Sequence, residues 1–308
     1  MNKMQWPERT ATYRSFAYDS KRWDGFVPRA GDIAICTPPK CGTTWMQMIC
    51  ALLIFQKTEF DRPLSGYSPW LDMLIAPVED VLDNLDAQKN RRFIKTHTPL
   101  DGLPYYEQMS YICVGRDPRD AFMSMEAHQR NVRPEAMAKM MENATFPLPP
   151  FDPGPKEPEA RFIRWIKASG KPGDEKDPLS SSVLHYVESF WRFRQLPNIL
   201  MVHYSDLKND LAGEMRRIAD FLDIAVREDL WPALVDAARF ENMKANADQL
   251  APDAEAGIWQ DNSGFFNKGK SGQWADLLGD EALAVYHDEM QARLEPELAH
   301  WLEHGRLG

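Results

Sequence analysis

The chain has 308 residues, of which 44% are hydrophobic and 27% are charged. This composition is ordinary for a soluble globular protein and leaves room for one large α/β domain or two small ones. The formal net charge of −10 argues against a general nucleic-acid binder, which would present a broad basic surface. An anionic ligand would therefore need lysines and arginines gathered at one place in an otherwise acidic protein.

The chain contains four cysteines whose spacing matches neither a disulfide framework nor a zinc pattern: Cys36, Cys41, Cys50 and Cys113. Two of them lie in apolar runs, so we expect buried thiols in a reducing compartment. Residues 1–18 lack the apolar segment of a signal peptide, and the longest apolar run, residues 45–55, is too short to span a bilayer. These features predict a cytoplasmic protein and leave peripheral membrane contact open.

A short apolar run, Ile33–Cys36, predicts a buried parallel strand. The next residues, Thr37–Trp45, contain two prolines, one lysine and one glycine, and an apolar helix follows them. We expect Thr43 or Thr44 to cap that helix. A loop between a strand and a helix N-terminus aims several backbone N–H groups at one point, and Lys40 adds a full positive charge there. The loop therefore suits a phosphate group.

This loop differs from the common nucleotide-binding sequence Gly-x-x-x-x-Gly-Lys-Ser/Thr, because Lys40 precedes Gly42 and no lysine follows it. Taken alone, the segment could also be a strand-to-helix turn with a chance lysine. Cys41 lies inside the loop, but no sequence feature supports a nucleophilic role for it. The rest of the chain has to decide between these interpretations.

A second strand is predicted in the segment Arg91–Leu100, which runs into a proline-containing loop. In an open α/β sheet, ligands bind beyond the carboxyl ends of the strands. Lys95 and His97 are placed there, on the same side of an extended chain. A lone histidine is most often structural, but this one stands at the mouth of the sheet, two residues from a lysine. That position favours a functional role.

A third strand, Tyr111–Arg116, leads directly into a helix whose start is marked by Asp117 as N-cap and by the proline that follows it. Arg116 ends the strand, and Ser124 lies two turns into the helix, on the same side as Asp117. The alternative is an arginine that only pairs with Asp120 and a serine that only fits a helix.

Residues 131–180 carry nine prolines and show no regular periodicity, except for a short amphipathic helix suggested at residues 160–166. We interpret this proline-rich segment as an insertion within a single domain that covers residues 1–308.

The rest of the chain again alternates between helix and strand. Helical spacing covers residues 182–196 and 210–222, and a fourth strand is predicted at Met201–Tyr204. A glycine-spaced basic loop, Phe265–Trp274, precedes a final helix at about residues 281–302. This alternation predicts an α/β fold with a central parallel sheet flanked by helices.

Four of these segments, in this order, resemble the motifs of sulfotransferases that use 3′-phosphoadenosine 5′-phosphosulfate (PAPS). Pro39–Trp45 resembles the family's 5′-phosphosulfate loop, and Arg116–Ser124 resembles its 3′-phosphate motif. Ile94–His97 resembles the catalytic strand end, and Lys268–Trp274, with glycines at its second and fifth positions, resembles the C-terminal loop. The resemblance implies a P-loop-like nucleotide-binding architecture.

Two further stretches, Ser68–Asp72 and Thr96–Gly102, are similar to bacterial family members called glycolipid sulfotransferases. This closer resemblance covers most of the chain.

The resemblance implies which residues bind the donor. Those implied at its 5′ end form one run: Lys40, Cys41, Gly42, Thr43, Thr44 and Trp45. Those implied at its 3′-phosphate are Arg116, Ser124, Lys268 and Gly269. Trp45 and Phe240 would flank the adenine ring, with Tyr204 beside it. Phe266 and Asn267 complete the implied donor-binding set. The alternative for Phe240 is an ordinary core aromatic.

The chemistry implied is in-line transfer of a sulfuryl group from PAPS to an acceptor hydroxyl, with 3′-phosphoadenosine 5′-phosphate (PAP) as product. Neutral His97 would take the hydroxyl proton. Lys40 and Lys95 would stabilise developing charge, and Ser124 completes the implied catalytic set. A sulfuryl group carries less charge than a phosphoryl group, so we expect fixed lysines to replace the metal of a kinase. We predict no metal site.

The chain departs from the family pattern at several positions. Cys41 replaces the usual serine, and Asn267 stands where an arginine of the 3′-phosphate site is usual. Gln273 and Ala275 replace the charged residues around Trp274. The dimerisation motif often found just after is not recognisable, so the sequence assigns no oligomeric state.

Two other functions stay open from the sequence: a nucleotide-dependent, kinase-like phosphotransferase and a non-catalytic binder of 3′-phosphoadenosine nucleotides. Lys95 and His97 count against the binder. The acceptor is not identified, because a phenol, sterol, glycolipid or sugar would all supply a hydroxyl. We expect its pocket to be shaped by residues 60–80, the proline-rich insertion and residues 251–264. Their aromatic side chains suggest an apolar or ring-containing alcohol: Tyr67, Trp70, Phe151, Trp165 and Trp259.

Overall fold

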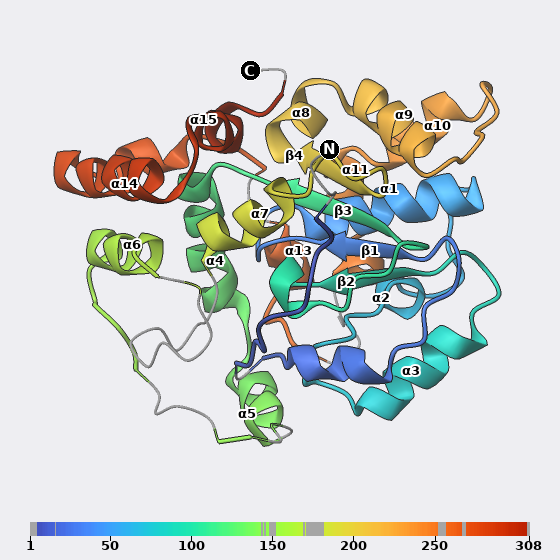
Figure 1. Ribbon diagram of the computed structural model, residues 1–308, viewed down its shortest axis with the longest axis horizontal. Helices are drawn as coiled ribbons and strands as arrows, with labels where there is room; N and C mark the ends of the chain where they lie inside the picture. The colour runs from blue at the N-terminus through green and yellow to red at the C-terminus, as the bar shows by residue number, and fades with distance from the viewer. Residues whose placement is uncertain are drawn as a thin grey trace.

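The computed structural model describes residues 5–15, 17–142, 144, 146–147, 152–168, 170, 182–251, 257–266 and 269–306. A four-stranded sheet with the order β2-β1-β3-β4 lies at its centre, and helices cover both faces (Figure 1). Every neighbouring pair of these strands is parallel. The central parallel sheet predicted from the sequence is therefore confirmed. The strands are β1 (Ile33–Cys36), β2 (Phe93–Thr96), β3 (Ser110–Gly115) and β4 (Ile199–His203).

The helices surround this sheet in chain order. The first group consists of η1 (Ser20–Gly25), α1 (Thr43–Phe55), α2 (Leu64–Tyr67), α3 (Val78–Ala87), η2 (Leu100–Gly102), α4 (Pro118–Asn131), α5 (Pro134–Glu142), α6 (Pro158–Ile166) and α7 (Val183–Trp191). The second group consists of α8 (Tyr204–Asn209), α9 (Leu211–Phe221), α10 (Trp231–Ala237), α11 (Phe240–Ala245), α12 (Ala247–Leu250), α13 (Asn262–Phe265), η4 (Gln273–Asp276), α14 (Asp280–Arg293) and α15 (Pro296–His304).

Alternate residues of β1 enter two different hydrophobic cores. Ile33 and Ile35 pack in the core that contains α1, whereas Ala34 and Cys36 pack in the core that contains α7 and η1. Because both faces of the sheet are covered, every position of the strand has to be apolar. This explains why the strand appears in the sequence as a short continuous apolar run.

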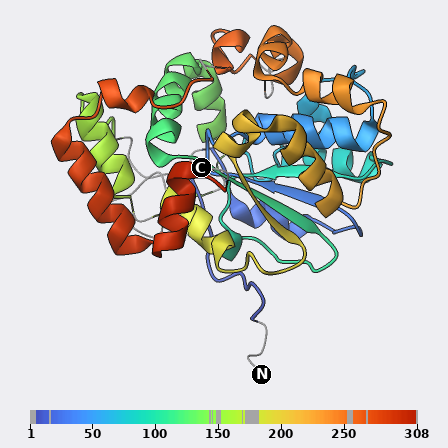
Figure 2. The same cartoon turned by 90° about the horizontal axis from the view of Figure 1, so that it is seen from above.

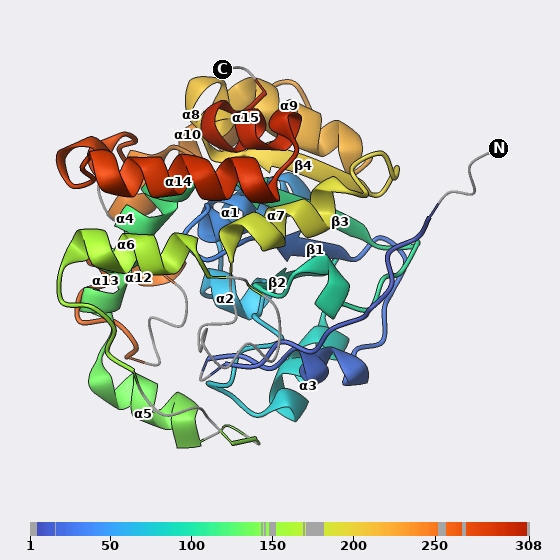
Figure 3. The same cartoon turned by 60° about the vertical axis from the view of Figure 1, so that its left-hand side comes forward.

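A third core lies beside the sheet and joins α4, α6, α7, α14 and α15. Figure 2 shows α4, α6 and α14 gathered at one side of the strands. In Figure 3, α6 and α14 run next to each other, in agreement with their direct contact. Helix α7 links this core to the sheet, because it contacts both β3 and β4.

The C-terminal helix α15 closes the end of the sheet. Gly115, the last residue of β3, has no side chain, and a Cβ atom there would overlap the ring of Trp301. The ring of His203 meets Trp301 edge to face at 5.0 Å, and its Nε2 donates a hydrogen bond to the Leu302 carbonyl at 3.1 Å. Glycine at position 115 therefore permits α15 to pack directly on the strand that leads into Arg116.

Three predicted elements need correction. The final helix predicted at residues 281–302 is two helices, α14 and α15, because Pro296 has no N–H to continue a helix and instead begins a new one. Tyr204 does not end β4 but starts α8. Helix α5 lies inside the predicted insertion, where no helix was expected before residue 160. The assignment of a single domain with an insertion at 131–180 stays a prediction.

All four thiols are free and buried, as expected, while the reducing compartment stays a prediction. Among the described residues, no helix is both long enough and apolar enough to cross a bilayer.

Candidate active site

The loop after β1 presents unbonded amides at the start of α1. Gly42 is the N-cap of this helix, with a left-handed φ of 106°, and no side chain caps the helix. The prediction that Thr43 or Thr44 caps it is wrong, because Thr43 is already helical and its hydroxyl bonds the Thr37 hydroxyl at 2.5 Å. The first-turn N–H groups therefore remain available to an anion.

Three of the sequence-predicted segments meet at one edge of the sheet. The parallel register pairs Cys36 with Thr96 of β2 and with Cys113 of β3, so the loops that follow all three strands start side by side. Arg116 donates a hydrogen bond from Nη1 to the Lys40 carbonyl at 3.0 Å. The sheet thus brings together the phosphate loop, the catalytic strand end and the arginine that were proposed from separate parts of the chain.

His97 is held as a neutral imidazole with a defined tautomer. Its Nδ1–H donates to the Thr37 carbonyl at 2.7 Å, which leaves the Nε2 lone pair free to accept a proton. Burial, and then the positive charges of Lys95 and Lys40, lower the pKa of His97 to about 3. A histidine in this state is neutral at physiological pH, so its Nε2 has a lone pair that can accept a proton.

Lys95 and His97 both contact Trp70. The Lys95 ammonium lies 4.2 Å from the centre of the Trp70 ring, and the His97 ring meets the same indole edge to face at 4.6 Å. Both side chains are buried, at 5% and 7% exposure. The predicted catalytic lysine and histidine therefore share one aromatic support, which the sequence had suggested only as part of an acceptor pocket.

Lys40 lies beside a second histidine that the sequence reasoning missed. Its Nζ is 3.3 Å from His128 Nδ1 and 4.1 Å from the centre of the Phe265 ring. Burial, followed by the charges of Lys95 and Arg116, lowers the pKa of Lys40 to about 7. Burial and the charge of Lys40 hold the pKa of His128 well below its usual range, so Nδ1 can accept a hydrogen bond from the ammonium.

A sequence signal for His128 existed. It stands four residues after Ser124 on α4, and residues four apart share one face of a helix. Ser124 itself is half-buried on α4.

The aromatic residues assigned to the donor lie together. The Tyr204 ring meets Trp45 edge to face at 5.2 Å, and the Arg116 guanidinium lies 4.2 Å from the centre of the Tyr204 ring. Trp45 is anchored by a hydrogen bond from its Nε1 to the Ala238 carbonyl at 2.8 Å. A Cβ atom at Gly42 would approach the Tyr204 ring at 3.1 Å, so the glycine lets the loop pass close to this aromatic group.

The C-terminal loop packs against the same region. Gly269 has a φ of 62°, and a Cβ atom there would come within 2.9 Å of the Phe240 ring. Phe266 meets Phe240 edge to face at 6.3 Å. Asp120 on α4 accepts a hydrogen bond from the Gly272 N–H at 2.8 Å, so this acid ties the loop to the helix. Of the remaining residues proposed from the sequence, Asn267, Lys268 and Phe151 lie outside the described part of the chain.

The residues present fit a doubly anionic nucleotide. Arg116 is 7% exposed, and its Nε has no hydrogen-bond partner within the described residues, which is unusual for a buried guanidinium. The uncapped amides of α1 follow the loop whose Lys40 carbonyl Arg116 binds. Two separate sets of donors are therefore available for two anionic groups.

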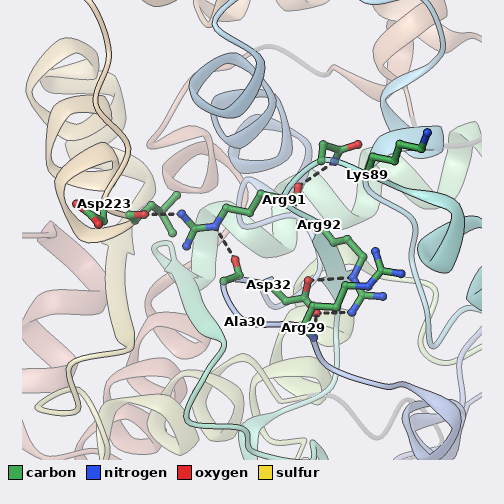
Figure 4. Close-up of a pocket in the computed structure, with 10 residues that line it drawn as sticks. Arg29, Ala30, Asp32, Lys89, Arg91, Arg92 and Asp223 are labelled. Carbon is green, nitrogen blue, oxygen red and sulfur yellow. Dashed lines mark hydrogen bonds and ion pairs between the residues drawn. The ribbon is translucent and has the colours of Figure 1, made fainter.

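A hollow of about 550 Å³ lies at the opposite end of the sheet. It is lined by the residues that precede β1 and β2, and Figure 4 shows its arginines bonded within the protein. Arg91 donates from Nε to the Gly31 carbonyl at 2.5 Å, and Arg29 donates to the Gln88 carbonyl at 2.7 Å. Arg92 donates to Asp32 at 2.9 Å. Because these side chains brace the protein itself, we assign the hollow a structural role.

Comparison with known proteins agrees with this geometry. The model of the sulfotransferase domain matches residues 30–298. The glycolipid sulfotransferase of Mycobacterium bovis (strain BCG / Pasteur 1173P2) is 39% identical over 311 residues, which cover 96% of this chain and 95% of that protein. The glycolipid sulfotransferase of Mycobacterium tuberculosis (strain ATCC 25618 / H37Rv) is 39% identical over 310 residues, with the same two coverages.

Solved structures share the fold. Mouse sulfotransferase SULT7A1 complexed with PAP has a TM-score of 0.68 and 20% identity, covering 92% of both chains. Retinol dehydratase in a complex with retinol and PAP has a TM-score of 0.65 and 23% identity, covering 90% of this chain and 84% of that one. Together with the match over residues 30–298, these findings show that the chain belongs to the sulfotransferase family.

Proposed function

We propose that this sulfotransferase moves a sulfuryl group from PAPS to an acceptor hydroxyl by in-line displacement, with PAP as the product. The observation that carries the proposal is His97: a buried, neutral imidazole whose Nδ1–H is bonded to the Thr37 carbonyl and whose Nε2 is free. This is the state that a general base needs before it accepts a proton from an alcohol.

The donor would bind through its two anionic ends. The open amides of α1 and Lys40 suit the 5′-phosphosulfate, and Arg116 suits the 3′-phosphate. Trp45 and Phe240 would flank the adenine ring, and Tyr204, which already contacts Trp45, would lie beside it. Lys40 has a pKa of about 7 in the absence of an anion, and a nearby sulfate or phosphate would stabilise its charged form.

In the transfer step, His97 Nε2 accepts the acceptor's hydroxyl proton while the oxygen forms a bond to sulfur and the bond from sulfur to the bridging oxygen breaks. Negative charge then develops on the leaving phosphate oxygen and on the sulfuryl oxygens. In our proposal Lys40 and Lys95, which lie over the rings of Phe265 and Trp70, stabilise that charge. Ser124, in our proposal, assists Lys40 and the 3′-phosphate from α4.

We infer an acceptor with lipid-like or ring-containing character. Aromatic side chains surround the base and the lysines: Trp70 packs on His97, while Trp259 and Phe265 pack on His128 at 4.9 and 5.9 Å. Relatives that are 39% identical are called glycolipid sulfotransferases, which supports an acceptor of that class. Four free, buried thiols support a reducing, cytoplasmic location.

The test is His97→Ala. Turnover should fall by about 10²–10⁴-fold, because general base catalysis has that magnitude, while PAP should bind as before in calorimetry. His300→Ala, an exposed histidine on α15, is the control and should leave both quantities unchanged. A His97→Ala variant with wild-type turnover would refute the assigned base.

The same calorimetry separates the kinase-like alternative. A sulfotransferase site should bind PAP more tightly than ATP, and added magnesium should not be required for PAP binding. Preference for magnesium-ATP would instead assign the loop to a phosphotransferase. Sulfate transfer from labelled PAPS to a panel of phenols, sterols, sugars and glycolipids would then identify the acceptor class.

A further inference from the structure

One short segment contacts four consecutive residues of the catalytic strand end. The segment Pro69–Asp72 lies parallel to the end of β2, where Lys95 N–H donates to the Pro69 carbonyl at 3.0 Å and Trp70 forms a parallel bridge with Lys95. Trp70 and Asp72 then reach residues 95–98 with their side chains. The proposed function uses Lys95 and His97 but gives this neighbouring segment no role.

Asp72 binds the two residues on either side of His97. Its Oδ2 accepts hydrogen bonds from the Thr96 hydroxyl at 2.5 Å and from the Thr98 hydroxyl at 2.6 Å. The Thr96 hydroxyl also accepts the Thr98 N–H at 3.0 Å, which closes a compact ring of bonds around the His97 backbone. One carboxylate oxygen therefore fixes the main chain before and after the base.

Trp70 fixes the side chains that Asp72 does not reach. Its indole meets the His97 ring edge to face at 4.6 Å and lies 4.2 Å from the Lys95 ammonium. Asp72 lies in the turn that follows Trp70, where the Met73 N–H donates to the Trp70 carbonyl at 3.4 Å, and the two side chains contact different residues of the strand end. Trp70 contacts residues 95 and 97, and Asp72 contacts residues 96 and 98.

Asp72 is a costly residue to bury. Its side chain is 0% exposed, and its second oxygen, Oδ1, has no hydrogen-bond partner among the residues that the structure describes. The Trp23 indole N–H donates to Oδ2 at 3.3 Å, so three side-chain donors converge on this one oxygen. A carboxylate with a half-satisfied hydrogen-bond capacity is unfavourable for stability alone, which points to a role in the site.

We propose that Asp72 is a positioning residue that orients His97 for proton transfer by clamping Thr96 and Thr98. The inference rests on the proposed role of His97 as the base. Without the clamp, the His97 backbone would be held from one side only, and its Nδ1–H bond to the Thr37 carbonyl would weaken. Because a misplacement of about 1 Å can cost about 10²-fold in rate, turnover should depend on these bonds.

The variants separate position from charge. Asp72→Ala removes the clamp and should lower kcat by about 30- to 100-fold. Asp72→Asn should restore most of this loss, because its amide oxygen can accept both threonine bonds without carrying a charge. Thr98→Val keeps the shape, removes one bond, and should lower kcat by about 10-fold. The Kd of PAP should stay within about twofold of wild type in all three variants. The substitutions change the positioning of His97 in the transition state and not the binding of the nucleotide.

Tyr111→Phe is the matched control. It removes two part-buried hydrogen bonds at the far end of β3: from the Tyr106 N–H to the Tyr111 hydroxyl at 2.8 Å, and from that hydroxyl to the Pro104 carbonyl at 3.3 Å. It should lower Tm by an amount similar to Thr98→Val and leave kcat unchanged. A purely structural role for Asp72 predicts instead that Tm falls and that kcat of the folded enzyme does not.

The ¹⁵N chemical shifts of the His97 ring give a reading that does not depend on turnover. Wild type should show one neutral tautomer with the proton on Nδ1, and Asp72→Ala should show a mixture. If Asp72→Ala does not fold, Thr98→Val decides by the same measurements. If a folded Asp72→Ala or Thr98→Val variant has the wild-type kcat and tautomer while His97→Ala is inactive, the inference about Asp72 is wrong and the proposed function stands. An active His97→Ala would overturn the proposed function itself.

Discussion

Lys40 and His97 show how burial prepares two basic side chains for opposite tasks. The pKa of both is lowered by burial and by neighbouring positive charge, to about 7 for Lys40 and to about 3 for His97. The histidine is therefore neutral at physiological pH and can accept a proton. The lysine stands near its midpoint, and a bound anion would complete its charge.

Donor affinity should therefore depend on pH. The lowered pKa means that Lys40 is charged below pH 7 and loses its charge as the pH rises through 7. Because an anionic donor binds the charged form, the affinity for PAP should fall by up to about tenfold per pH unit above that point. Calorimetry between pH 6 and 9 measures this. Lys40→Arg, which stays charged, should remove the pH dependence, and an unchanged slope in that variant would assign it to another group.

The loss of kcat at low pH should be caused by the protonation of a group other than His97. Because its pKa is about 3, His97 stays neutral down to about pH 4, and the rate should show no loss with the midpoint near 6.5 that an exposed histidine would give. Measurement of kcat against pH from 5 to 8 tests this expectation. A fall centred at 6.5 that disappears in a His97 variant would contradict the buried, neutral state.

At the scale of single elements, the loop before α1 depends on one glycine. Gly42 has a φ of 106°, and a Cβ atom would also approach the Tyr204 ring at 3.1 Å. Gly42→Ala should therefore destabilise the protein by about 1–2 kcal/mol and weaken PAP binding, because the amides of α1 would shift. Gly31→Ala is the matched control: its φ is 85°, but its Cβ atom would meet Arg91 only at 3.6 Å, far from the site. Equal PAP affinity in both variants would contradict this expectation.

The elements that could be predicted are those whose signals are local. The apolar run of β1 and the Asp117-Pro118 helix start lie within a few residues of the structure that they specify. The errors have a common physical cause. The helix break at Pro296 was missed because the apolar spacing continues through it, and the α1 cap was wrong because Thr43 bonds Thr37 across the loop instead.

Contacts between residues far apart in the chain could not be predicted from the sequence either. Trp70 reaches Lys95 and His97, and His128 reaches Lys40, across separations that no local pattern reports. The motifs placed the chemistry at the carboxyl edge of the sheet, since parallel strands end there by geometry. The residues that position the proposed catalytic side chains come from distant segments of the chain. Tertiary packing brings them there, so only the folded structure identifies them.

For the molecule as a whole, the far end of the sheet supplies stability. Arg92 and Asp32 are 1% and 2% exposed, and two hydrogen bonds join them directly before β2 and β1. Removing one partner of a buried pair is costly, so Asp32→Asn should lower the free energy of unfolding by about 3 kcal/mol. Chemical denaturation measures this, and the Kd of PAP should not change.

The control for this pair is Asp86→Asn. Asp86 also faces Arg92, at 3.3 Å, but is 66% exposed, so its loss should cost less than about 1 kcal/mol. Similar losses in the two variants would show that burial does not set the strength of this pair.

The contact of Trp301 with Gly115 has a consequence for biosynthesis. Arg116 follows Gly115 directly. The side chain that packs on Gly115 is Trp301 of α15, almost two hundred residues further along the chain. A nascent polypeptide on the ribosome can assemble the strands and the first phosphate loop early. It cannot seat the arginine firmly until α15 has emerged, so the nucleotide should stabilise nascent chains in which α15 is exposed and not shorter ones.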